Sequence, residues 1–142
     1  MRSIIKSKKR KITIASQKVA KIKIKAMTQK DKELLLKDLC ARLPYRVHMH
    51  TNSTDNIELL DIVRDIDYED QYWINGYYYV EDVRPYLRSM EDMTEEEKKR
   101  WEDFCFIDTG EIYDFLNSNH FDYRGLIEKG LALEAPEDMY KD

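Results

Sequence analysis

Two histidines one residue apart, His48 and His50, form the pattern in this sequence that comes nearest to a metal site. In a β-strand, residues i and i+2 point to the same face, so the pair could supply two imidazole ligands to one ion. The sequence places no third ligand with them. Because Met49 between them would face inward, we predict that both imidazoles lie on a solvated strand face and that no metal is bound.

A nucleophile, a base and an orienting carboxylate could be assembled from Cys105, His120 and Asp122. Nothing in their spacing requires this arrangement, and a cysteine on the apolar face of a helix usually behaves as a small core residue. We therefore predict that Cys40 and Cys105 are reduced core residues. None of the four glycines begins a phosphate-binding loop. We expect no catalytic residue and no cofactor, and hence a protein that is not an enzyme.

Aromatic residues gather around an Asn75-Gly76 pair, which is the preferred sequence of a type I′ hairpin turn. A two-residue loop predicts three cross-strand pairs: Ile74 with Tyr77, Trp73 with Tyr78, and Tyr72 with Tyr79. We expect the face that carries Trp73 to be core. Aromatic side chains are favoured interface anchors, so we expect the other face to bind a partner protein through Tyr72, Tyr77 and Tyr79. The alternative is that helices cover both faces.

Acidic residues are dense around this hairpin: Asp61, Asp65, Asp67, Glu69, Asp70, Glu81 and Asp82. A strongly acidic surface repels nucleic acid and can engage basic surfaces of proteins. The alternative is that these side chains only keep the protein in solution.

Apolar spacing and capping residues predict the elements that would position these side chains. A helix over 29–42 begins after Thr28 and stops before Pro44, and a strand over 45–51 follows it. The turn at 52–56 leads to an apolar run, 57–63, whose pattern suggests burial on more than one side. Pro85 is expected at an edge or at the end of the second hairpin strand. Thr94 caps a helix over 95–105.

A further helix is expected around residues 112–116, capped by Asp108 and Thr109, with a short strand before Pro136. Runs of strands followed by helices are typical of the α+β class. We therefore predict an α+β fold with one small antiparallel sheet of three to four strands, packed with about three helices.

Charge divides the 142 residues into two unlike parts. Residues 1–26 hold ten Lys or Arg and no acidic residue, whereas residues 27–142 hold 14 basic and 28 acidic residues. We expect 1–26 to be a basic arm or a translated leader, with a short strand as the third alternative, and 27–142 to be a single acidic domain. Nucleic acid could bind only through 1–26. No apolar run is long enough to span a membrane, so we expect a cytoplasmic protein.

Four stretches of the sequence carry a resemblance: MTQKDKELLLKDLCARLPY (27–45), VRPYLRSM (83–90), MTEEE (93–97) and HFDYRGLI (120–127). They resemble a family of short proteins without an assigned activity, common in gut Bacteroidales genomes and in their phages or mobile elements. The resemblance covers nearly all of 27–142 and none of 1–26. It implies a bacterial, cytoplasmic setting, and it implies no site residues.

Three functions remain open on the sequence. The first, which we favour, is a small non-enzymatic accessory protein that binds another protein through its acidic, aromatic surface. The second is a nucleic-acid binder that uses residues 1–26, and the third is an enzyme whose site is dispersed along the chain.

We predict that a variant starting at Met27 unfolds at the same temperature as the full chain. The acid-free segment ends where a capped helix begins, so the core should form without it. Thermal unfolding of both proteins, followed by circular dichroism, is the measurement. A clearly lower midpoint for the shorter protein would show that 1–26 packs on the domain.

Overall fold

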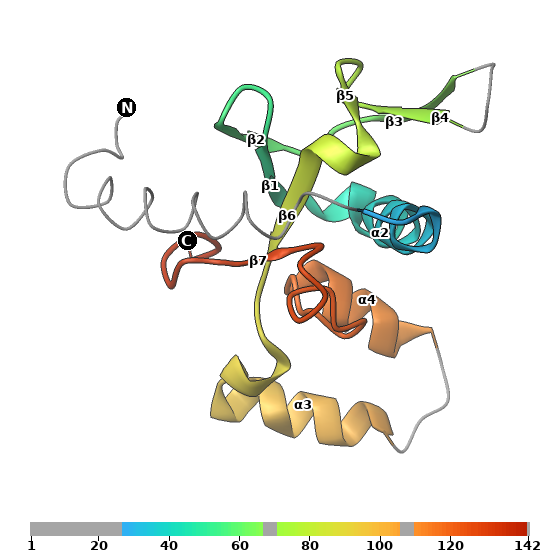
Figure 1. Ribbon diagram of the computed structural model, residues 1–142. Helices are drawn as coiled ribbons and strands as arrows, with labels where there is room; N and C mark the ends of the chain where they lie inside the picture. Colours follow the sequence, from blue (N-terminus) through green and yellow to red (C-terminus); the bar gives the residue numbers. More distant parts are fainter. Residues whose placement is uncertain (1–26, 67–70, 106–109, 142) are drawn as a thin grey trace.

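The computed structural model describes residues 27–66, 71–105 and 110–141, and it confirms the α+β class (Figure 1). The described helices are α2 (Gln29–Arg42), α3 (Glu95–Cys105) and α4 (Glu111–Ser118), with short 3-10 turns η1 (Leu43–Tyr45), η2 (Val80–Asp82) and η3 (Met90–Asp92). The described strands form two sheets, where the sequence predicted one. None of the described helices is long and apolar enough to cross a membrane.

The larger sheet has the strand order β2-β1-β6-β7, formed by β2 (Asn56–Leu59), β1 (His48–Thr51), β6 (Val83–Leu87) and β7 (Leu133–Glu134). Strand β1 is antiparallel to both neighbours, and β6 is parallel to β7. The prediction that Pro85 marks an edge or a strand end is wrong, since Pro85 lies inside β6. It is tolerated because β1 pairs with β6 only over Val83–Pro85, and β7 pairs only with Tyr86 and Leu87.

The smaller sheet has the order β3-β4-β5, formed by β3 (Val63–Ile66), β4 (Gln71–Ile74) and β5 (Tyr78–Tyr79). Asn75 and Gly76 both have positive φ, and the Tyr77 N–H donates to the Ile74 carbonyl at 3.1 Å. The predicted turn is therefore present.

The predicted register of this hairpin is wrong by one residue. Tyr77 stays outside the ladder, so Ile74 pairs with Tyr78, and Trp73 pairs with Tyr79. A shift by one residue on one strand moves its side chains to the opposite face. Ile74 and Tyr78 are consequently buried, whereas Trp73 is half-buried and stacks on Tyr79 with ring centroids 4.8 Å apart. The expectation that Trp73 lies in the core is wrong.

The side chain of Asn75 attaches the hairpin to the segment before β3. Its Oδ1 accepts the N–H groups of Asp61 and Ile62 at 2.8 and 3.2 Å, and its Nδ2 donates to the Leu59 carbonyl at 2.8 Å. The Tyr78 hydroxyl donates to the Glu58 carboxylate on β2. These contacts join the two sheets. Ile57 and Ile62 remain exposed, so the predicted burial of 57–63 on more than one side is wrong for both of them.

The two main helices begin where the sequence predicts. Thr28 and Asp31 form a reciprocal capping box at α2, and Thr94 and Glu97 do the same at α3. The predicted cap of α4 at Asp108 and Thr109 lies outside the described residues.

Both cysteines are exposed, so their assignment to the core is wrong. Helix α2 buries Leu35 and Leu39, and Cys40 follows on a neighbouring face. In α3, Trp101 and Phe104 pack inward, and Cys105 is turned away from them.

Two apolar clusters hold the domain together. The larger lies between α2 and the two sheets and includes Leu35, Met49, Ile74 and Leu126. The smaller joins η3, α3 and α4 around Phe121. In Figure 1, α2 lies next to the β3-β4-β5 sheet, and α3 lies beyond the far end of β6.

A buried ionic network joins α2 to the segment that follows α4. Asp38 and Arg42 have no exposed side-chain surface, and their Oδ2 and Nε atoms are 2.7 Å apart. Arg42 Nη2 donates to the Phe121 carbonyl at 2.6 Å, and Arg124 Nη1 reaches the second Asp38 oxygen at 2.7 Å. Each carboxylate oxygen of Asp38 therefore faces a guanidinium group. This network connects residues more than 80 positions apart in the chain.

We predict that Asp38→Asn lowers the free energy of unfolding by about 3–5 kcal/mol, because it leaves the Arg42 guanidinium buried without a counter-charge. Urea denaturation measures the change. The matched control is Glu95→Gln, which removes an exposed ion pair with Lys98 and should cost less than about 1 kcal/mol. Equal effects of the two substitutions would contradict the role of the network.

Candidate binding groove between helix α2 and the tyrosine hairpin

The structure places the three predicted partner-binding tyrosines in two different settings. Tyr72 and Tyr79 both line a groove between α2 and the β4-β5 hairpin, whereas Tyr77 lies at the hairpin loop. Tyr77 has 77% of its surface exposed, and Tyr79 has 41%. Tyr72 packs partly against the main core cluster.

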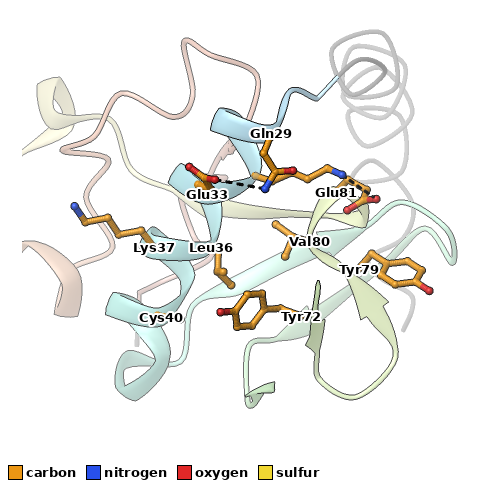
Figure 2. Close-up of a pocket in the computed structure, with 10 residues that line it drawn as sticks. Gln29, Glu33, Leu36, Lys37, Cys40, Tyr72, Tyr79, Val80 and Glu81 are labelled. Atoms are coloured by element: carbon orange, nitrogen blue, oxygen red, sulfur yellow. Dashed lines mark hydrogen bonds and ion pairs between the residues drawn. The ribbon is translucent and has the colours of Figure 1, made fainter. Parts of the chain in front are cut away.

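The groove has a helix wall and a sheet wall and encloses about 450 Å³ (Figure 2). Residues 29, 33, 36 and 40 of α2 lie along it, a spacing of four, three and four positions that places them on one face of a helix. Tyr72, Tyr79, Val80 and Glu81 form the opposite wall.

The side chains at the base of the groove are apolar, and those at its rim are charged. Figure 2 shows Leu36 and Tyr72 pointing toward one another, with Val80 beside them. At the rim, Lys32 and Glu81 are 3.6 Å apart, so one ion pair joins the two walls. Both side chains are partly exposed, and a pair in such a setting contributes little to stability. A bound chain can therefore displace it at small cost.

Cys40 closes one end of the helix wall. Desolvation raises the pKa of its thiol, so the residue remains protonated at neutral pH. A thiol in this state is a poor nucleophile. The groove therefore offers a surface for contact, and its cysteine is not activated for covalent chemistry.

The prediction that both strand histidines face solvent is wrong for His50. Its ring is buried, with Nδ1 3.0 Å from the Asn52 side chain and Nε2 2.8 Å from Asp55. The 52–55 turn folds back over β1 and brings both partners to the ring. His48 is half-buried beside Tyr140, with ring centroids 5.1 Å apart. Within the described residues, no group of three or more side chains could hold a metal ion.

The possible triad of Cys105, His120 and Asp122 is not assembled. Asp122 directs its two carboxylate oxygens to the N–H groups of Leu126 and Ile127, at 2.8 and 3.0 Å. His120 stacks on Tyr140 instead. In the part of the chain that the structure describes, no hydrogen bond joins any two members of the triad.

Part of the acidic stretch around the hairpin can be placed. Asp61 is exposed, and Glu81 and Asp82 are partly exposed near the groove. Asp67, Glu69 and Asp70 lie outside the described residues, and so does the side chain of Asp65.

Two of the tyrosines singled out in the sequence, Tyr72 and Tyr79, line the groove, whereas the sequence did not indicate its helix wall. The spacing of Gln29, Glu33, Leu36 and Cys40 was visible in the sequence as a mixed polar and apolar stripe, a pattern that usually faces water. Only the position of the hairpin makes this stripe one side of a groove. Comparison of the chain with protein-family models, with curated proteins and with solved structures finds no match.

We predict that Ile74→Ala costs about 2–5 kcal/mol of unfolding free energy, because its side chain is fully buried. Tyr77→Ala should change stability by less than about 0.5 kcal/mol. Chemical denaturation of both variants tests the hairpin register, since a two-residue loop would place Tyr77 opposite Ile74 on the buried face. A large loss with Tyr77→Ala would contradict the three-residue loop.

Proposed function

We propose that this protein is a non-enzymatic, protein-binding accessory module and that the groove between α2 and the tyrosine hairpin is its binding site. The observation that carries the proposal is the groove itself, with an apolar base next to partly exposed tyrosine. Protein interfaces commonly combine a central apolar or aromatic pocket with a polar rim.

The partner we propose is a protein segment with an apolar or aromatic anchor flanked by lysine or arginine. The anchor fits the base of the groove between Leu36 and Tyr72. The rim carries Lys32 and Lys37 as well as Glu33 and Glu81, with Asp82 next to Glu81. The carboxylates would meet the flanking basic residues once Glu81 exchanges its ion pair with Lys32 for one with the partner. Residues 27–142 hold twice as many acidic as basic residues, which favours the approach of a basic segment over long range.

We further propose, from the sequence resemblance alone, that the protein works in the cytoplasm of a bacterium as part of a chromosomal, phage or mobile-element system. An accessory role of this kind needs a binding surface and no reactive centre.

The two cysteines of the chain allow a direct test. Cys40 lines the groove, and Cys105 is exposed at the end of α3. Cys105→Ser leaves only Cys40, and Cys40→Ser leaves only Cys105, so a bulky maleimide can be attached at either position. Cysteine-free peptides selected from a random displayed library would serve as probes, with affinity measured by fluorescence polarisation.

We expect the selected peptides to share an apolar anchor flanked by basic residues. A maleimide on Cys40 should abolish their binding, and the same label on Cys105 should leave it unchanged. Tyr79→Ala should weaken binding at least about tenfold, whereas Tyr113→Ala, an exposed tyrosine on α4, should not. Peptides without a shared anchor, or equal effects of the two labels, would contradict the proposal.

A further inference from the structure

A second cavity, of about 500 Å³, lies at the end of the larger sheet where β1 begins and β2 ends. Its lining comes from η1, the start of β1 and the end of β2, Arg88 directly after β6, the end of α4 and the segment around Tyr140. It shares no lining residue with the groove described above. None of its lining side chains is a carboxylate, although the domain as a whole is acidic. We call it the cationic cavity, after Arg46, Arg88 and Lys141.

Two of these three cations are available to a ligand. Arg88 already pairs with Glu97 through two contacts, at 2.9 and 2.8 Å, and lies over the Phe121 ring. Arg46 makes no ion pair or hydrogen bond with any described residue. Lys141 makes only a 3.8 Å contact with Glu137, and both side chains are largely exposed. Arg46 and Lys141 thus supply two positive charges at the mouth of the cavity.

Two histidines line the cavity with unused hydrogen-bonding capacity. His120 is nine-tenths buried, and its Nδ1 has no partner among the described residues, which is also true of His48 Nδ1. Buried polar atoms in folded proteins nearly always have a partner, so two unpartnered ring nitrogens in the lining of one cavity point to a polar ligand. Tyr140 packs against both rings, with centroid distances of 3.6 Å to His120 and 5.1 Å to His48.

Burial and nearby cationic side chains both act on the two histidines of the cavity. Burial, and then the charges of Arg42, His48 and Arg88, lower the pKa of His120 to about 4. Burial and Arg46 also lower the pKa of His48. Both imidazoles are therefore neutral at pH 7, and a neutral ring still has one N–H to donate. Burial disfavours an ion of either sign, whereas the charges of Arg42, Arg46 and Arg88 disfavour an imidazolium ion and favour an anion.

Two residues of the cavity lining have left-handed backbone conformations. Arg46 and His120 adopt φ values of 58° and 62°, in the left-handed region that L-residues rarely occupy. They are two of only four non-glycine residues with positive φ in the described part of the chain. Both conformations end a helix: Arg46 is the C-cap of η1, and His120 follows α4, where its N–H donates to the Asn117 carbonyl and the Phe121 N–H donates to the Leu116 carbonyl.

We infer that the cationic cavity binds a phosphate monoester in its dianionic form. Two free cations match two negative charges, and neutral imidazoles add N–H donors without adding charge. The cavity volume lies in the range of small-molecule sites and leaves room for an organic group beside Tyr45 and Tyr140. This inference is independent of the proposed protein-binding function.

The three histidines of the chain make the test specific to this cavity. The ¹⁵N-labelled full chain would be titrated at pH 7 and constant ionic strength with phenyl phosphate, sulfate or acetate, while the imidazole signals are followed by NMR. Phenyl phosphate and sulfate should shift the His48 and His120 signals in a saturable manner, with phenyl phosphate binding more tightly. His50, whose ring nitrogens already contact Asn52 and Asp55, should not respond. Acetate should have no effect.

Matched variants separate this cavity from general attraction of anions to basic residues, including those of 1–26. Arg46→Gln removes an available cation, and it should weaken phenyl phosphate binding at least about tenfold. Arg64→Gln removes an exposed arginine on β3 and should leave the affinity unchanged. The unperturbed His50 signal would show that each variant is folded. An absent or non-saturable shift, equal shifts of all three histidines, acetate binding as tight as that of phenyl phosphate, or equal effects of the two substitutions would overturn the inference.

Discussion

The carboxylate of Asp38, which is fully removed from water, imposes the main constraint on this fold. A buried charge is tolerated only with close partners. Arg42 supplies one from the next turn of α2, and Arg124 supplies the other from 86 positions along the chain. Arg42 also donates to the Phe121 carbonyl, and Phe121 belongs to the smaller apolar cluster. One ionic network therefore fixes α2 against the segment after α4. It also fixes the position of the smaller apolar cluster relative to the larger one.

The segment that this network fixes also contains His120, which lines the cationic cavity. His120 precedes Phe121, and its carbonyl accepts the Arg88 N–H at 2.7 Å, while the Asp122 N–H donates to the Arg88 carbonyl at 2.8 Å. The end of β6 is thus held on both sides of Phe121. This arrangement, together with the capping bonds at the end of α4, keeps His120 in its left-handed conformation.

Sequence reasoning succeeded where the deciding interactions are local. The caps at Thr28 and Thr94 depend on residues three positions away, and the turn at Asn75-Gly76 depends on two adjacent residues. It failed where contacts between distant parts of the chain determine the burial of a side chain or the register of a strand. An Asp38–Arg42 pair at i and i+4 looks like an exposed helical ion pair, and nothing near it in the sequence reveals Arg124. The hairpin register likewise depended on Tyr77 leaving the ladder, which the turn sequence does not specify.

The stacking of Trp73 on Tyr79 has a practical consequence. Tyr79 is part of the groove wall, and the chain contains one further tryptophan, Trp101, which packs in the smaller cluster with α3. Indole fluorescence is sensitive to the polarity and contacts of its surroundings. The fluorescence of Trp73 is therefore sensitive to changes at the groove, because its ring stacks on a tyrosine of the groove wall. The fluorescence of Trp101 is sensitive to changes in a separate part of the domain.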